Sequence, residues 1–586
     1  MASTASAQEP VALIAGWEYA PDAADGGLAA GWATGEAPDA AWTAVAIPHV
    51  FDARPLPGLF AGTVGWYRIT FNAPTDAEGW ALRFGSVRRV AQVWLNGIEL
   101  GTHRDPYVPF EMGATGLRPG EPNTLVVRVD NRKGVEPKEG WWNWGGIVRP
   151  VSLVARGATS LQGVGLLPRY RCAAGACGWS VLLDGELAGH ADGPQELTIA
   201  VALRAPDGAI SQLEAPVAPV AVGERRRVRL EVPITGHPAL WAPEHPALYA
   251  ASVELRAGGI VRQVEHERVG LRTVSVREDH LQLNGRPLNL RGASLHEDLP
   301  GLGAALDDAG IERIIADLKA VNANVTRAHY VLDERLLDRF DEEGILVWNQ
   351  APIYHRDRAL RDQAGRFGAL ATVRGTVLTA RNHPSVIVHS VANELSPRPD
   401  DIPGTRRFLQ AAARLTRDLD PTRPVALDIF CYPGYPRQRT YDAFDAIGVN
   451  GYYGWYQGKR GHSTADEAGL TPFLKTMHER HPGQALVLTE FGAEAARSGL
   501  PSAKGTFEYQ AGYLRRTLRA VDRLAFMSGA IYWTLREFAI KPRWSGGDRW
   551  LGDPFHSKGL LNYDGTPKPA WHDARGLFGR TPLYRR

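Results

Sequence analysis

Hydrophobic and polar residues alternate in short runs through the first half of the chain, and this pattern changes after about residue 275. Runs such as 65–71, 90–95 and 124–129 alternate as strands with one buried face do, and Asn96-Gly97 is typical of a tight hairpin turn. The pattern predicts a β-sandwich over residues 1–157.

A second β-rich block follows at residues 158–275. Its runs 197–203 and 227–232 alternate in the same way, and the block has the size and strand rhythm of an immunoglobulin-like β-sandwich. The sequence therefore predicts two consecutive sandwiches before the second half of the chain begins.

Apolar runs and amphipathic stretches alternate over residues 276–586. The stretch 308–322 predicts a helix, because apolar residues fall on one face of it: Ile311, Ile314, Ile315, Leu318 and Val321. Eight strand–helix repeats can be counted, which is the number that closes a (β/α)8 TIM barrel. The predicted strands are 288–296, 323–328, 345–349, 386–392, 424–430, 445–450, 485–490 and 529–534.

Two of these predicted strands end in a glutamate. The fourth runs into Asn393-Glu394, and the seventh ends at Glu490. Active-site residues of TIM barrels lie at the carboxyl ends of the strands. Strands four and seven lie across the barrel mouth from each other, so we expect the two carboxylates to face each other over a small substrate.

A facing pair of carboxyl groups is what glycoside hydrolysis requires. One group must be neutral to protonate the leaving oxygen, and the other must be ionised to meet the positive charge that builds on the anomeric carbon. Each glutamate alone is equally well explained as a helix cap or a salt-bridge partner. The two together favour a glycosidase.

Composition narrows the expected partners. Lys+Arg 66 and Asp+Glu 64 nearly balance and no basic stripe is present, so nucleic acid is not expected. No apolar run is long enough to span a bilayer, so no membrane partner is expected. We predict neither a cofactor nor a metal, since no nucleotide-binding loop appears and His383 and His389 lack the H-E-x-x-H spacing; a metal-dependent hydrolase is a weak alternative.

The N-terminus and the cysteines bear on the compartment. Residues 2–10 are small and polar and contain an A-x-A-like stretch, as found around signal-peptide cleavage sites. Cys172 and Cys177 are close enough in sequence to pair, which would leave Cys431 free. Our hypothesis is a secreted or periplasmic protein that has lost a signal peptide, with an ordinary N-terminus in the cytoplasm as the alternative.

Seven short segments, spread in order along almost the whole chain, resemble motifs of glycoside hydrolase family 2, which includes β-galactosidases, β-glucuronidases and β-mannosidases. The resemblance implies a jelly-roll sugar-binding-like domain, an immunoglobulin-like domain and a catalytic barrel that retains anomeric configuration. It also implies that Glu394 is the acid/base and Glu490 the nucleophile. The matching segments are 65–68, 145–151, 240–246, 291–298, 324–330, 393–394 and 489–492.

The resemblance suggests further roles around this pair. Arg327 is expected to keep Glu490 ionised, Asn393 to bind the sugar 2-hydroxyl, and Tyr452 to hydrogen-bond the nucleophile. Trp533 is expected to form the floor of the subsite. A structural salt bridge is the alternative for Arg327, and buried packing is the alternative for Tyr452 and Trp533. Four further residues belong to segments that line the pocket in the family: Asn450, His296, Asp298 and His329, with Asp298 ranked above the two histidines.

One lysine bears on which sugar the protein is expected to bind. The segment 450–456 resembles that of β-glucuronidases, which hold the substrate carboxylate with an Asn-x-Lys motif; here Lys558 is kept and His556 replaces the asparagine. Arg536, Arg543 and Arg549 are further candidate cations. We predict a β-uronidase, with a neutral-sugar β-glycosidase and a non-catalytic carbohydrate-binding protein as alternatives. The expected partner is a carbohydrate or glycoside, and homo-oligomerisation is left open.

Overall fold

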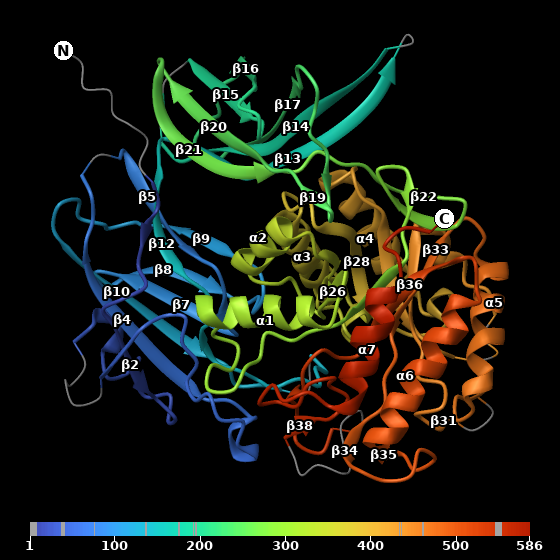
Figure 1. Cartoon of the computed structure of the whole chain (residues 1–586). Coiled ribbons are helices and arrows are strands. Elements are labelled where there is room, and N and C mark those ends of the chain that lie inside the picture. Colours follow the sequence, from blue (N-terminus) through green and yellow to red (C-terminus); the bar gives the residue numbers. More distant parts are fainter. Residues whose placement is uncertain are drawn as a thin grey trace.

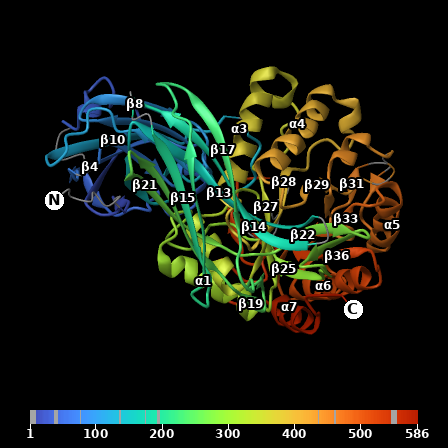
Figure 2. The same cartoon turned by 90° about the horizontal axis from the view of Figure 1, so that it is seen from above.

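Two β-sandwiches pack against the side of a closed barrel in the computed structural model (Figure 1). Seen from above, both sandwiches lie on one side of the molecule and the barrel on the other (Figure 2). The structure describes residues 9–36, 42–75, 77–134, 137–173, 176–191, 193, 196–432, 434, 436–459, 462–544 and 554–585. The segment on which the signal-peptide hypothesis depends lies mostly outside these residues, as does Arg549.

The N-terminal sandwich confirms the first predicted β block. One sheet has the order β1 (Val11–Ala12), β12 (Val151–Arg156), β5 (Gly79–Phe84) and β9 (Phe110–Gly113). The other has the order β3 (Thr43–Val45), β2 (Trp17–Pro21), β4 (Val64–Asn72), β10 (Pro122–Asp130), β7 (Val90–Leu95) and β8 (Ile98–His103). A short ribbon joins β6 (Val87–Arg88) to β11 (Gly146–Ile147). Asn96 and Gly97 both have positive φ at the β7–β8 turn, as a tight hairpin requires.

The second sandwich also has two sheets. One contains β13 (Thr159–Ala173), β14 (Ala176–Gly189) and β17 (Arg225–Pro233), and the other β16 (Ile210–Val217), β15 (Leu197–Arg204), β20 (Tyr249–Ala257) and β21 (Ile260–Val269). A disulfide joins Cys172 to Cys177 across the β13–β14 pair, as the sequence allowed, and Cys431 is free.

The barrel closes with the eight predicted strands, each within two or three residues of its expected bounds. They are β25 (Leu290–Ala293), β26 (Val325–Arg327), β27 (Leu346–Gln350), β28 (Val386–Asn393), β29 (Val425–Phe430), β30 (Ala446–Asn450), β33 (Ala485–Glu490) and β36 (Met527–Tyr532). Every residue of β28 and β33 is buried, which explains why both strands are mostly apolar. A small sheet of β22 (Val274–Arg277), β23 (His280–Leu283) and β24 (Arg286–Pro287) precedes the barrel.

Helices surround the barrel strands. The predicted helix 308–322 is α1 (Asp308–Ala320), capped by Asp307, whose side chain accepts a hydrogen bond from the Gly310 amide. The others are α2 (Glu334–Glu343), α3 (Gln363–Ala380), α4 (Pro403–Leu419), α5 (Leu470–Arg480), α6 (Phe507–Asp522) and α7 (Pro569–Arg580). Among the described helices, none combines the length and apolar character needed to traverse a bilayer.

Short two-stranded ribbons complete the fold. They pair β18 (Trp241–Ala242) with β19 (His245–Pro246), β31 (Gly458–Lys459) with β32 (His462–Ser463), β34 (Ala495–Arg497) with β35 (Gly505–Thr506), and β37 (Phe538–Ala539) with β38 (Phe555–His556).

The N-terminal sandwich reaches into the barrel through Trp141. Its indole stacks on the ring of His329, with ring centroids 5.4 Å apart, and its Nε1 donates a 2.8 Å hydrogen bond to the Tyr107 hydroxyl. Tyr107 in turn donates to Glu139 at 3.0 Å. The stacked rings of Trp141 and His329 therefore come from two different domains of the chain.

Candidate active site

A cavity of about 540 Å³ opens at the carboxyl ends of the barrel strands. Both predicted catalytic glutamates line it, Glu394 directly after β28 and Glu490 at the end of β33. Five other predicted site residues line it as well: His329, Asn450, Tyr452, Trp533 and Lys558. Aromatic rings make much of the remaining wall: Tyr354, Phe430, Tyr432, Tyr456 and Trp544.

Glu490 is held from both sides. Arg327 Nη1 donates to Glu490 Oε1 at 2.8 Å, and the Tyr452 hydroxyl donates to Oε2 at 2.8 Å. Burial raises the pKa of Glu490 to about 7; the charge of Arg327 opposes this rise, and the charge of Glu394 adds to it. Both oxygens are thus oriented by charge-assisted or hydroxyl hydrogen bonds, as expected for a carboxylate that must point at one atom of a substrate.

Glu394 has a different environment. Its Oε1 accepts a 2.9 Å hydrogen bond from Asn450 Nδ2, and its Oε2 lies 3.0 Å from His355 Nε2. Burial alone would raise the pKa of Glu394, but the contacts with His355, Asn450 and Arg327 outweigh burial and hold the pKa below its ordinary value. The residue has φ 51°, so the backbone turns sharply at the strand end and aims the side chain into the cavity.

Arg327 and Asn393 lie behind the cavity wall. Arg327 is fully buried, and its Nη2 donates to Asn393 Oδ1 at 2.7 Å. Asn450 Nδ2 reaches the same Asn393 oxygen at 3.1 Å. Asn393 Nδ2 is a buried donor that has no hydrogen-bond partner among the described residues. A buried donor without a partner is costly, and a ligand hydroxyl would satisfy it.

His329 and Trp533 form one wall of the cavity. The two rings lie 4.5 Å apart between centroids, and His329 Nδ1 bonds Gln350 Oε1 at 2.9 Å. Burial and the charge of Arg327 hold the pKa of His329 well below its ordinary value, so the imidazole is neutral. Its Nε2 lies 3.6 Å from Glu490 Oε1.

Lys558 brings a buried positive charge to the same cavity. Its ammonium donates to the Tyr456 hydroxyl at 2.7 Å and to Glu494 Oε1 at 3.2 Å, and it lies 5.3 Å from the Tyr452 ring centroid. Burial alone would lower the pKa of Lys558, but Tyr456 and Glu494 raise it above its ordinary value, so the ammonium stays charged. His556 also lines the cavity, 3.4 Å from the ammonium.

Asp298 is tied to the segment that follows β36. It is buried, it does not line the cavity, and protein donors occupy both of its oxygens: the Ala539 amide at 2.8 Å and the Tyr563 hydroxyl at 2.9 Å. It therefore helps to fix the segment after β36, and its contact with a substrate stays a prediction. Arg536 does not line the cavity and pairs with Asp317 on α1.

Sequence reasoning missed His355 and Glu494. His355 follows β27, and Glu494 lies four residues after Glu490. The rule that polar groups at the carboxyl ends of barrel strands carry chemistry applies to both loops. Neither residue ends an apolar run directly, so the search for strand-terminal polar groups passed over them.

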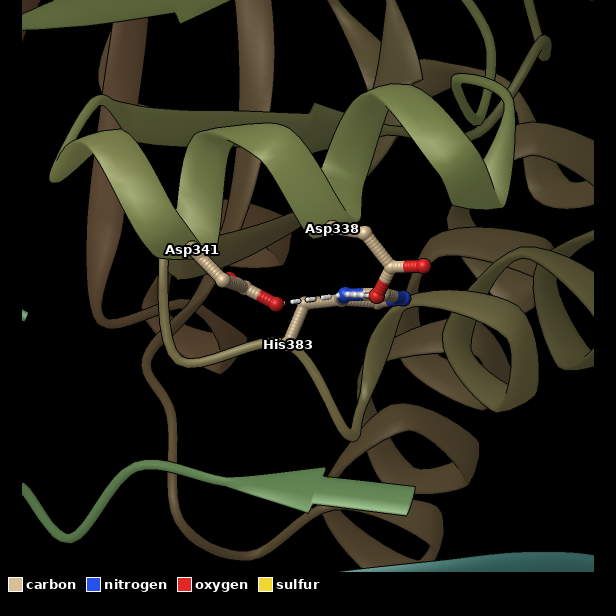
Figure 3. Close-up of side chains that lie close together, drawn as sticks. All are labelled: Asp338, Asp341 and His383. Atoms are coloured by element: carbon tan, nitrogen blue, oxygen red, sulfur yellow. Dashed lines mark hydrogen bonds and ion pairs between the residues drawn. The ribbon is translucent and has the colours of Figure 1, made fainter. Parts of the chain in front are cut away.

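A group of three possible metal ligands lies elsewhere, where α2 faces the loop before β28. Figure 3 shows Asp338 and Asp341 of α2 beside the ring of His383. His383 Nδ1 bonds Asp341 Oδ2 at 2.7 Å, and Arg268 lies 2.7 Å from Asp338 Oδ1. Basic side chains therefore already balance both carboxylates, and the group fastens α2 to the amino end of β28.

Comparisons with known proteins agree with this architecture. The model described as "Glycosyl hydrolases family 2, TIM barrel domain" matches residues 274–580. The model "Glycosyl hydrolases family 2" matches residues 176–272, and "Glycosyl hydrolases family 2, sugar binding domain" matches residues 8–157. The three matches follow one another along almost the whole chain.

Individual proteins show the same likeness. A β-glucuronidase of Paenibacillus borealis is 28% identical over 561 residues, covering 89% of this chain and 88% of the relative. A crystal structure of a GH2 β-galacturonidase from Eisenbergiella tayi bound to galacturonate has a TM-score of 0.83 at 22% identity, covering 99% of each chain. The Ruminococcus gnavus β-glucuronidase structure has a TM-score of 0.82 at 23% identity, covering 98% of each chain.

These two structural matches concern the fold, whereas the family models match the sequence itself. Since the barrel model alone covers more than half of the chain, and the other two models account for the sandwiches, the assignment is direct. The protein is a member of glycosyl hydrolase family 2.

Proposed function

We propose that this protein is a retaining exo-β-uronidase, which removes a terminal β-linked uronate such as glucuronate or galacturonate from its aglycone. The observation that carries the proposal is a buried, charged Lys558 in the same cavity as Glu394 and Glu490. A neutral sugar offers this ammonium only uncharged hydroxyl acceptors, whereas the C6 carboxylate of a uronate offers an opposite charge. Relatives named as β-glucuronidases support the same substrate class.

Each carboxylate has a separate role in the proposed reaction. Glu490, oriented by Arg327 and Tyr452, attacks the anomeric carbon and forms a glycosyl–enzyme ester. Glu394 protonates the departing glycosidic oxygen. It then removes a proton from the water that cleaves the ester, so the enzyme returns to its initial protonation.

The sugar is oriented by groups around this pair. Asn393 Nδ2, a buried donor that no described residue partners, supports a hydrogen bond to the 2-hydroxyl. Trp533 offers an aromatic face for the pyranose ring, and Lys558, which lines the same cavity, receives the carboxylate. The aromatic wall of Tyr354, Phe430 and Tyr432 is left for the aglycone.

One observation favours a second candidate, a neutral-sugar β-glycosidase. Glu494 lies 3.2 Å from the Lys558 ammonium and already balances part of its charge. In that case Lys558 would fix the Tyr456 hydroxyl as a donor or acceptor for a sugar hydroxyl instead of binding a carboxylate. A non-catalytic carbohydrate-binding protein is disfavoured, because the contacts that tune both glutamates are intact.

The test is hydrolysis of a panel of 4-nitrophenyl β-glycosides. We expect turnover of the glucuronide or the galacturonide and little turnover of the galactoside and mannoside. Glu490→Gln should abolish turnover, and Glu394→Gln should spare mainly substrates with good leaving groups. Turnover of neutral glycosides only would refute the uronidase proposal, and normal rates in either variant would refute the assigned roles.

We also propose that the protein works in an oxidising compartment. The Cys172–Cys177 disulfide supports this, because such bonds persist in secreted and periplasmic proteins and are rare in the cytosol. Mass spectrometry of the natively produced protein tests it. A reduced Cys172 in freshly isolated, alkylated protein would contradict the proposal.

A further inference from the structure

The loop after β27 places a histidine against the acid/base candidate. His355 Nε2 lies 3.0 Å from Glu394 Oε2, within hydrogen-bonding distance. The His355 side chain is 37% exposed and that of Glu394 is 16% exposed, so the histidine occupies the outer side of the pair. Both residues line the same cavity.

The backbone holds this pair together. His355 and Glu394 both have left-handed backbones, at φ 48° and 51°, and Tyr354 bridges Asn393 in a strand-like pairing. Asp357 ties the two loops further, because it accepts hydrogen bonds from the Ser396 amide at 2.9 Å and the Thr405 hydroxyl at 2.6 Å. Left-handed conformations of residues other than glycine persist where the surroundings enforce them, often at functional sites.

Several charges act on the pair. Burial lowers the pKa of His355, but Glu394, Asp357 and Glu490 together raise it above its ordinary value. Since the pKa of Glu394 is lowered, the unliganded pair favours an ionised Glu394 beside a protonated His355. Other titratable or charged groups around the cavity also act on His355 or Glu394. They are Arg327 at the end of β26, His329 in the loop after β26, and Tyr354, Cys431, Tyr452 and Tyr456.

We propose that His355 and Glu394 share one proton, and that transfer of this proton from His355 Nε2 to Glu394 Oε2 produces the acid that protonates the leaving group. The inference rests on the proposed glycosidase function. In the step an N–H bond breaks and an O–H bond forms, and both side chains become neutral. His355 is therefore a positioning residue that acts through Glu394.

The transfer also serves the nucleophile. The negative charge of Glu394 is one cause of the raised pKa of Glu490. When Glu394 accepts the proton its negative charge disappears, which lowers the pKa of Glu490; the loss of the more exposed His355 charge opposes this only in part. One proton shift along a hydrogen bond thus turns the resting charges into the charges that hydrolysis requires. Leaving-group departure returns Glu394 to the ionised form, and the attacking water later supplies a new proton.

A pair of basic sites binds a shared proton more tightly than either site alone, because the two binding constants add. The basic limb of the pH profile of kcat/KM reports loss of this proton from the free enzyme. Removing His355 should therefore move the basic limb to lower pH. A role in packing alone would lower the rate at all pH values without moving the limb.

His355→Asn is the informative variant, since asparagine tolerates a left-handed backbone and cannot carry the charge. We expect the basic limb to move down by about one pH unit, and kcat on an alkyl uronide to fall about tenfold, with less than about twofold loss on the 4-nitrophenyl uronide. His237→Asn, at an exposed position of the second sandwich, is the matched control. The double variant His355→Asn/Glu394→Gln should equal Glu394→Gln alone.

A titration without substrate separates this inference from the proposed function. In NMR of ¹⁵N-histidine-labelled protein, the imidazole signal that disappears in His355→Asn should titrate at higher pH in the wild type than in Glu394→Gln. Equal titration in the two, an unmoved basic limb, or an additive loss in the double variant would overturn the inference. Failure to hydrolyse any uronide would instead overturn the substrate proposal, and the NMR result would stand.

Discussion

Replacement of Lys558 by methionine separates charge recognition from packing. The Lys558 side chain is only 1% exposed. Methionine keeps most of the length of its aliphatic chain and removes the ammonium. A hydrogen bond to a buried charged partner contributes about 2–3 kcal/mol, so kcat/KM on a uronide should fall about 30- to 150-fold. The same change should barely alter the rate on the corresponding neutral glycoside, which presents a hydroxymethyl group at that position.

The neighbouring Glu494 complicates this variant and also provides its control. Lys558→Met leaves Glu494 buried, 3% exposed, without its cation, and an unpaired buried carboxylate destabilises the fold. The double variant Lys558→Met/Glu494→Gln removes both charges and should recover thermal stability without recovering uronide turnover. Steady-state kinetics on paired uronide and neutral 4-nitrophenyl substrates provide the assay. An equal loss on both substrates would refute the reasoning, because a carboxylate-specific contact cannot weaken a neutral glycoside.

Three further substitutions test other parts of the structure. Tyr452→Phe removes a hydrogen bond that lowers the pKa of Glu490, so the acid limb of the kcat/KM profile should move to higher pH by about one unit; an unmoved limb would contradict the contact. Burial lowers the pKa of His383, but Asp341 outweighs burial and raises that pKa to about 9. The ion pair therefore adds about 3 kcal/mol to the free energy of unfolding below about pH 6.5, and this is lost as pH rises through 9. His383→Gln should flatten this part of a plot of Tm against pH, and an unchanged plot would argue against the ion pair. Asp298→Asn should cost about 1–3 kcal/mol in denaturant unfolding, because an amide cannot accept both of its bonds, and should leave KM unchanged; a raised KM would show that Asp298 contacts the substrate.

The barrel could be predicted from the sequence because buried parallel strands leave a simple pattern. The runs that end at Asn393 and Glu490 are buried and mostly apolar, so the polar residues at their ends mark the barrel mouth. Arg327 and Asn450, which were selected after the family resemblance, also end strands, β26 and β30. Residues that end strands are therefore the part of the site that periodicity reveals.

Residues within loops were harder to place. Asp298 lies five residues past the end of β25, and nothing in the sequence shows that the Ala539 amide and the Tyr563 hydroxyl take up its oxygens. His355 sits at a similar distance past β27, yet its left-handed backbone turns it back to Glu394. Loop direction depends on contacts between distant segments, and a single sequence contains no record of them.

Trp141 has a consequence for how this chain can be divided. The indole of Trp141, from the N-terminal sandwich, lies against His329. A barrel produced without this sandwich would therefore leave the ring of His329 uncovered beside the catalytic glutamates. Swapping sandwiches between relatives would then alter the active centre as well as the molecular surface. Chimeras should therefore carry the segment around Trp141 together with the barrel that it supports.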